Sequence, residues 1–228
     1  MIFDLLMTGD IKGAIISFLL SVPIIILILS VHEYAHGLVA KKLGDPTAES
    51  LGRLTLNPLK HIDPIGFIMF IVLGIGYAKP VPINSRYFKK PKRDMALVGV
   101  AGPIANLIMS IIFAALIKLL FLLIQFIPMT APVWTVTALS YIYQILYLGV
   151  FYNIAFAIFN LIPVPPLDGS RLLYAFLPSK ALLWFQRYEQ YFMWGLLGVF
   201  IVFNFLNINI IGKVTLFFVN LLFKIFFI

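Results

Sequence analysis

Cysteine is absent from the 228 residues, and charged residues make up only 11% of them. No disulfide framework can therefore hold the fold. Soluble domains carry about 25% charged residues, so a chain that is 62% hydrophobic is predicted to be an integral membrane protein. The net charge of +8 does not indicate nucleic acid as a partner. The basic residues lie beside apolar segments, where they report topology and contact with membrane lipid.

Long apolar runs predict an all-α polytopic membrane protein, because a helix satisfies its own backbone hydrogen bonds in lipid. We expect about five to six membrane helices, with a short re-entrant segment over residues 65–78, which are too few for an easy span. Small β-hairpin or strand elements are expected over 53–57, where polar and apolar residues alternate, and over 79–84. The long apolar segments cover residues 11–43, 94–127, 133–161, 183–206 and 208–228.

Histidine is also scarce, with three in the chain, and two of them lie four residues apart in the motif H-E-Y-A-H at 32–36. On a helix, His32 and His36 share one face and can bind one zinc ion. Glu33 lies beside that ion, with a carboxylate that can take a proton from a metal-bound water. The alternative is a packed or solvated histidine pair, but such polar groups inside an apolar helix are costly in lipid without a shared task.

A catalytic zinc ion takes three protein ligands and keeps one open position. Asp168 is the outstanding candidate for the third ligand, because it follows a proline cluster that forbids regular helix at the end of an apolar segment. Irregular backbone at membrane depth is tolerated where it lines a cavity. The alternative is an interfacial turn that caps a helix beginning near Ser170. The other candidates are Asp45, Glu49, His61, Asp63, Asp94 and Glu189.

Charge along the chain gives an independent prediction of topology. Ten of the 17 basic residues lie between Lys41 and Arg93, so the positive-inside rule places this stretch in the cytoplasm if residues 65–78 do not cross. Two further spans then return Asp168 to the membrane face that carries His32 and His36. The first ten residues hold two Asp and no basic residue, so we expect no cleavable signal peptide.

Five motifs follow one another along the chain: HEYAH at 32–36, GRLTLNPLKHIDPIG at 52–66, AKPVPIN at 78–84, GPIAN at 102–106 and NLIPVPPLDG at 160–169. Together they resemble the site-2 proteases, which are zinc intramembrane metalloproteases of the M50 type. The resemblance covers residues from about 20 to 190 and is closest to the minimal members, which lack PDZ and CBS domains. It implies that His32, His36 and Asp168 bind Zn²⁺ and that Glu33 is the general base. It also places Asn160 near the zinc.

We hypothesise that Asn160 or His61 holds the oxyanion of the cleaved bond, although His61 could instead make a structural hydrogen bond that ties its loop to the helices. A single domain is expected over 1–228, with a catalytic core over about 20–190 and additional C-terminal helices over about 183–228.

The expected function is zinc-dependent cleavage of peptide bonds in or near transmembrane segments. The active site would lie in the cell membrane near its cytoplasmic face, and the partners would be a transmembrane protein substrate and lipid. The sequence leaves the oligomeric state open. Two alternatives stay open: a zinc transporter or metal-binding membrane protein, and an inactive, substrate-holding relative.

Overall fold

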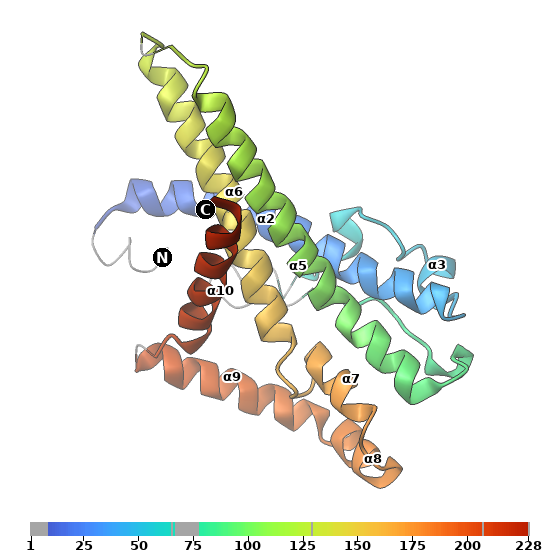
Figure 1. The fold of residues 1–228 in the computed structure, drawn as a ribbon. Helices are drawn as coiled ribbons and strands as arrows, with labels where there is room; N and C mark the ends of the chain where they lie inside the picture. The colour runs from blue at the N-terminus through green and yellow to red at the C-terminus, as the bar shows by residue number, and fades with distance from the viewer. Residues whose placement is uncertain (1–8, 65, 67–77, 129, 207, 228) are drawn as a thin grey trace.

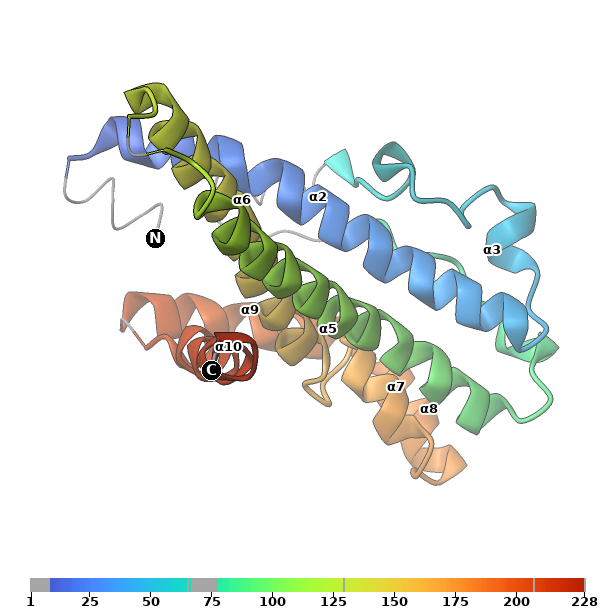
Figure 2. The same cartoon turned by 45° about the horizontal axis from the view of Figure 1, so that its top comes forward.

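The computed structural model describes residues 9–64, 66, 78–128, 130–206 and 208–227, and this part of the chain is built mainly from helices. Its one β pairing is an isolated antiparallel bridge between Ile62 and Ala78, so the strands expected over 53–57 and 79–84 do not form a sheet. Figures 1 and 2 show the arrangement. The elements are α2 (Ile11–Lys42), α3 (Thr47–Ser50), η1 (Pro58–Lys60), η2 (Ser85–Tyr87), α5 (Pro91–Ile124), α6 (Val133–Asn160), α7 (Asp168–Tyr174), α8 (Ser179–Arg187), α9 (Glu189–Phe205) and α10 (Ile210–Phe227).

Helix α2 begins and ends where its local chemistry dictates. The Asp10 carboxylate accepts a hydrogen bond from Gly13 N at 2.8 Å and so caps the first turn. The helix continues through Pro23. It ends at Lys42, just before Gly44, whose φ of +105° few other residues adopt.

Four helices of the described chain are long and apolar enough to cross a membrane: α2, α5, α6 and α10. The chain is therefore a multi-pass membrane protein, with fewer spans in this part than the five to six expected. The apolar stretch over 183–206 is divided at Tyr188 into α8 and α9. The 17 residues of α9 reach only about 26 Å, short of the ~30 Å hydrocarbon core. The expected re-entrant segment lies almost wholly outside the described residues.

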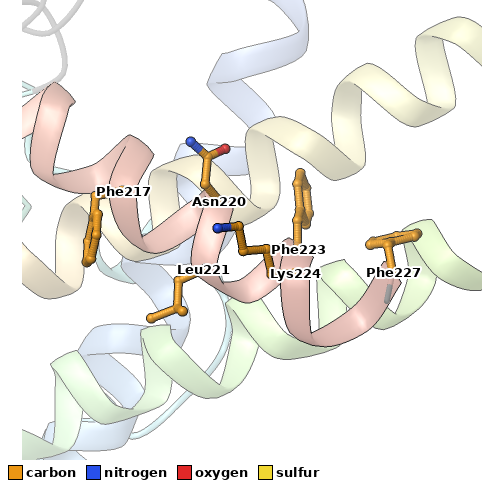
Figure 3. A pocket seen from close by; sticks show the side chains of 6 residues that line it. All are labelled: Phe217, Asn220, Leu221, Phe223, Lys224 and Phe227. Atoms are coloured by element: carbon orange, nitrogen blue, oxygen red, sulfur yellow. The ribbon is translucent and has the colours of Figure 1, made fainter.

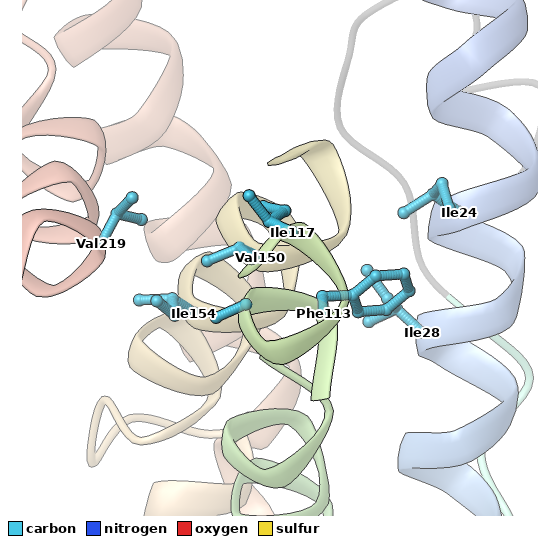
Figure 4. Close-up of a cluster of buried hydrophobic side chains, with 8 residues drawn as sticks. Ile24, Ile28, Phe113, Ile117, Val150, Ile154 and Val219 are labelled. Atoms are coloured by element: carbon cyan, nitrogen blue, oxygen red, sulfur yellow. The ribbon is translucent and has the colours of Figure 1, made fainter. Parts of the chain in front are cut away.

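The four long helices share one buried apolar cluster, shown in Figure 4. Ile28 and Val150 have 0% exposure, and Ile117 and Val219 have 1%. Lipid tails are as apolar as these side chains, so the cluster stabilises the bundle by close packing rather than by removal from water. Its members are Ile24 and Ile28 of α2, Phe113, Ala114 and Ile117 of α5, Val150 and Ile154 of α6, and Val219 of α10.

Helices α2 and α5 run antiparallel, and this places the polar residues of α2. Ile24 and Ile28 pack in the cluster with Phe113 and Ile117. About three turns further along α2, Ala40 packs with Val98 near the start of α5. The residues of α2 between these two contacts, His32 and His36 among them, therefore face the middle of α5.

Candidate metal centre

His32 and His36 continue the buried stripe that Ile24 and Ile28 begin. All four residues are spaced at intervals of four, so they lie on one face of α2. His32 is 4% exposed and His36 is 3% exposed. Two imidazoles are thus held one helical turn apart inside an otherwise apolar contact, as the spacing predicted.

Asp168 reaches the same point from the end of α6. The prolines that follow Asn160 stop the helix, and the chain turns before α7 begins at Asp168 itself. Gly169 makes this turn possible: a Cβ atom there would lie 2.3 Å from the Leu161 carbonyl oxygen and 2.6 Å from that of Ile162. The carboxylate of Asp168 is not the cap of the helix, which disfavours the interfacial-cap alternative.

The three side chains meet in a compact triangle of atoms. Asp168 Oδ2 lies 3.0 Å from His32 Nε2 and 3.1 Å from His36 Nε2, and the two Nε2 atoms are 3.0 Å apart. Three ligands of a tetrahedral zinc ion, each about 2.0–2.2 Å from the metal, lie roughly 3.3–3.5 Å from one another. The triangle is slightly tighter than that and fits the ion after small shifts. Among the described residues, His32, His36 and Asp168 form the one group of His, Asp or Glu side chains close enough together to hold a metal ion.

A glycine on α5 keeps space beside the two imidazoles. A Cβ atom on Gly102 would lie 2.5 Å from His36 Nε2 and 2.6 Å from His32 Nε2. No side chain of any size fits there while the rings keep their positions. Gly102 therefore lets the backbone of α5 pack directly against the two Nε2 atoms, at a position where any other residue would displace the rings.

The far nitrogen of each imidazole also faces a partner on α5. His36 Nδ1 donates to the Val98 carbonyl oxygen at 2.7 Å, which leaves the Nε2 lone pair free for a metal. His32 Nδ1 lies 3.1 Å from the amide nitrogen of Asn106, and the buried Asn106 Oδ1 has no partner in the described chain. From the sequence, Asn106 has no predicted role of its own and is named only within the GPIAN motif. Its signal was a polar residue four positions after Gly102 within an apolar span.

Asp168 has a second neighbour besides the histidines. Arg171, one turn along α7, places Nη1 3.4 Å from Asp168 Oδ1. Burial of Asp168 opposes its charge, but the close approach of His32 and His36 outweighs burial and lowers the pKa of this carboxyl below its usual range. A zinc ligand must be the deprotonated carboxylate, and this direction favours that form.

Glu33 points to a different partner from its neighbour His32. Its Oε2 accepts a hydrogen bond from Val81 N at 2.8 Å. Val81 stands between Pro80 and Pro82, which have no N–H group. The single backbone donor of this Pro-Val-Pro segment is thus used to hold the Glu33 carboxylate.

The same segment is fastened from its other side. Arg53 Nη2 donates to the carbonyl oxygens of Lys79 and Pro80, at 2.8 and 3.1 Å. Lys79 N donates to the His61 carbonyl oxygen at 2.8 Å. Most backbone donors and acceptors of residues 79–81 are therefore already used within the protein. Few remain to pair with a further strand.

No hydrogen bond in the described structure joins either proposed oxyanion residue to the three clustered side chains. His61 is buried and donates from Nε2 to the Thr55 carbonyl oxygen at 2.7 Å, while its Nδ1 has no partner in the described chain. This hydrogen bond joins two positions of the same loop and does not reach a helix. Asn160 Nδ2 donates to the Phe156 carbonyl oxygen at 3.0 Å. The oxyanion role of both residues stays a prediction.

Two of the other acidic candidates hold backbone rather than metal. Asp45 accepts hydrogen bonds from Thr47 N at 2.9 Å and from Asn84 N at 2.7 Å. Asp94 accepts from Lys90 N at 2.9 Å. A separate concavity on α10 (Figure 3) contains no His, Asp or Glu, so it offers no second metal centre; it is lined by Phe217, Asn220, Leu221, Phe223, Lys224 and Phe227.

Comparisons with known proteins agree with this geometry. The sequence model of peptidase family M50 matches residues 19–139 and 123–203. "Putative zinc metalloprotease YwhC" of Bacillus subtilis (strain 168) is 38% identical over 192 residues, which cover 84% of this chain and 81% of the relative. "Putative zinc metalloprotease Rip2" of Mycolicibacterium smegmatis is 32% identical over 62% of this chain, a match that spans only 51% of that relative. No solved structure matches the chain.

Proposed function

Because the chain belongs to peptidase family M50 and is a zinc metalloprotease, we propose that it cleaves peptide bonds within the membrane, in or near transmembrane segments of other proteins. The observation that carries this proposal is the buried triangle of His32, His36 and Asp168. Its first two members lie in a helix long and apolar enough to span the bilayer. Cleavage at this site therefore requires a substrate that enters the membrane region.

The depth of the site follows from its distance to the basic end of α2. Lys41 and Lys42 form the last turn of the helix. By helical rise, His36 lies about 8 Å before Lys41 and His32 about 14 Å before it. We infer that the site is submerged near the membrane face that carries these lysines, which the positive-inside rule makes the cytoplasmic face of the cell membrane.

The proposed mechanism assigns a role to each group of the site. His32, His36 and Asp168 would hold Zn²⁺, which when bound polarises the scissile carbonyl and acidifies water. Glu33 is the general base. Its Oε2 is fixed by the Val81 N–H, so Oε1 is the oxygen that accepts the proton from the attacking water. Glu33 then returns this proton to the leaving amine.

The contacts from α5 set the tautomers that this role requires. A histidine that offers Nε2 to a metal carries its proton on Nδ1 and donates it to an acceptor. The Val98 carbonyl oxygen is that acceptor for His36. For His32 the acceptor is the Asn106 side-chain oxygen. A 180° flip of the Asn106 amide exchanges its oxygen and nitrogen, and so places the oxygen next to His32 Nδ1. Asn106 is thus a positioning residue for His32.

Proteolysis by the purified chain tests the proposal. A single-span membrane protein would be incubated with the wild type, with Glu33→Gln, and with wild type treated with a chelator. We expect cleavage by the wild type alone, and a zinc content in Glu33→Gln equal to that of the wild type. A zinc transporter would instead move zinc into vesicles whether or not Glu33 is present. An inactive relative would bind the substrate and leave it intact.

A further inference from the structure

A groove between the first turns of α5 and helix α7 combines a basic rim with apolar walls. The rim is formed by three exposed cationic side chains at the start of a membrane-spanning helix. The walls are apolar side chains of both helices and of Phe176, which follows the end of α7. The residues that define this groove, here called the α5–α7 groove, are Lys90, Lys92, Arg93, Leu97, Leu172 and Phe176.

The charge of the rim is not neutralised by the protein. Within the described chain, the Lys and Arg side chains that pair with carboxylates are Lys41 and Arg171, and neither belongs to the rim. The nearby Asp94 is buried and accepts from the backbone N–H of Lys90 rather than from a side chain. Lys92 Nζ donates to the Leu177 carbonyl oxygen at 2.7 Å, which orients its charge at the rim. Three positive charges thus share one small surface.

The walls are equally open. Phe176 is 82% exposed, Leu97 is 40% exposed and Leu172 is 39% exposed. Leu97 lies seven residues after Lys90, which is about 10 Å deeper along α5. Because α5 spans the membrane, the rim lies at the level of lipid headgroups and the walls at the level of the first acyl carbons.

We propose that the α5–α7 groove binds one anionic phospholipid of the phosphatidylglycerol type. Its phosphate would contact Lys90, Lys92 and Arg93, and one acyl chain would cover Leu97, Leu172 and Phe176. Basic residues near a membrane surface attract anionic headgroups, and basic pockets beside transmembrane helices suit such headgroups. A zwitterionic lipid carries no net charge to match the rim.

The concavity on α10 provides an internal comparison. It is also open and partly apolar, but Lys224 is its one basic residue (Figure 3). Selectivity for an anionic lipid is therefore expected at the α5–α7 groove and not at α10. The groove is also the one that touches the metal-binding element, because α7 begins at Asp168. A lipid that contacts α5 and α7 together would hold these helices against each other. The proposal does not depend on proteolysis.

Native mass spectrometry of the full chain in detergent micelles tests the proposal. The micelles would contain equal amounts of dioleoyl-phosphatidylglycerol and dioleoyl-phosphatidylcholine. We expect the wild type to retain one phosphatidylglycerol in clear preference to phosphatidylcholine. The triple variant Lys90→Gln, Lys92→Gln, Arg93→Gln should lose that preference by about tenfold or more.

Two matched variants separate a site from general surface charge. The control triple Lys42→Gln, Lys60→Gln, Arg86→Gln removes the same charge from exposed positions outside the groove and should keep the preference. The charge-conserving triple Lys90→Arg, Lys92→Arg, Arg93→Lys should keep it as well, which excludes misfolding as the cause of a loss. The proposal would be overturned if the wild type bound both lipids equally, or if the control triple lost the preference as much as the groove triple does. A bound protein in place of lipid would overturn it as well.

Discussion

Helices α2 and α10 are both long and apolar enough to span a membrane, yet they use their polar residues in opposite ways. On α2 the serines and histidines are buried, and each of the hydroxyls of Ser21 and Ser30 donates to a carbonyl oxygen four residues earlier. His32 and His36 face α5. On α10, Asn220 and Lys224 line an open concavity instead (Figure 3).

The difference shows where the chemistry of the bundle is concentrated. Polar groups inside a membrane are costly and are retained where they share a task. The α2–α5 contact holds two metal-binding imidazoles and the groups that orient them. Helix α10 buries only Thr215 and Val219 in the described structure and acts as a packing element. Variants on the two helices should therefore differ sharply in their effect on zinc binding and proteolysis.

Removal of a metal-binding imidazole should have the largest effect. His36→Ala takes away one of three ligands and leaves Asp168 with a single histidine partner. We expect the loss of stoichiometric zinc and a fall in proteolysis of about a thousandfold or more. Zinc content by atomic absorption and cleavage of a single-span substrate would measure the two effects. If His36→Ala kept both zinc and activity, the α2–α5 contact would not be the site of zinc binding.

Gly102→Ala should have the next largest effect. Its new Cβ atom would lie 2.5 Å from His36 Nε2, so the imidazoles must move out of their triangle. We expect zinc affinity to fall roughly 10- to 100-fold, the range typical of disturbed ligand orientation. Gly198→Ala on α9 is the matched control, because no atom lies within 4 Å of its Cβ position. Unchanged zinc affinity in Gly102→Ala would contradict the placement of the two rings.

Asn106 tests how the α5 side of the contact orients His32. In Asn106→Ala, His32 loses the acceptor for its Nδ1 proton, and we expect zinc affinity to fall about tenfold. Asn106→Asp supplies a carboxylate oxygen at the same place and should retain most of the affinity. Competition with a chromogenic chelator measures both constants. Equal losses in the two variants would indicate that Asn106 only packs.

The smallest effect is expected on α10. Asn220→Ala and Lys224→Gln alter the polar residues of its concavity without touching the buried cluster. We expect zinc affinity and proteolysis to change by less than about twofold, as surface changes usually do. A large loss of proteolysis with zinc retained would assign α10 a part in substrate binding and would remove the contrast between the two helices.

Short-range patterns in the sequence pointed to His32, His36 and Asp168, and the structure brings these three side chains together. The four-residue spacing fixes His32 and His36 on one face of a helix, and the prolines before Asp168 mark the break that turns it toward them. The family resemblance then joined the two segments. The position of Asn106 beside His32 was not predicted, because it depends on the register of α5 against α2, which no single segment encodes.

The remaining differences have local causes. The alternation over 53–57 is typical of a strand, but in the structure Asn57 caps η1 through a hydrogen bond from Leu59 N. Pro80 and Pro82 remove donors from the other expected strand. The apolar run over 183–206 is interrupted at Tyr188, where the neighbouring Gln186, Arg187 and Glu189 already lower the local hydropathy. Asn160 bonds within its own helix, and a sequence motif does not specify a rotamer.

X-ray absorption at the zinc edge tests the central claim most directly, because it reports the atoms bound to the metal. For the purified wild type we predict one zinc ion per chain, with two imidazole nitrogens and at least one oxygen about 2.0–2.2 Å away. In Asp168→Ala the zinc should be lost or bound far more weakly. A wild-type spectrum without two imidazoles, or an unchanged site in Asp168→Ala, would contradict the account.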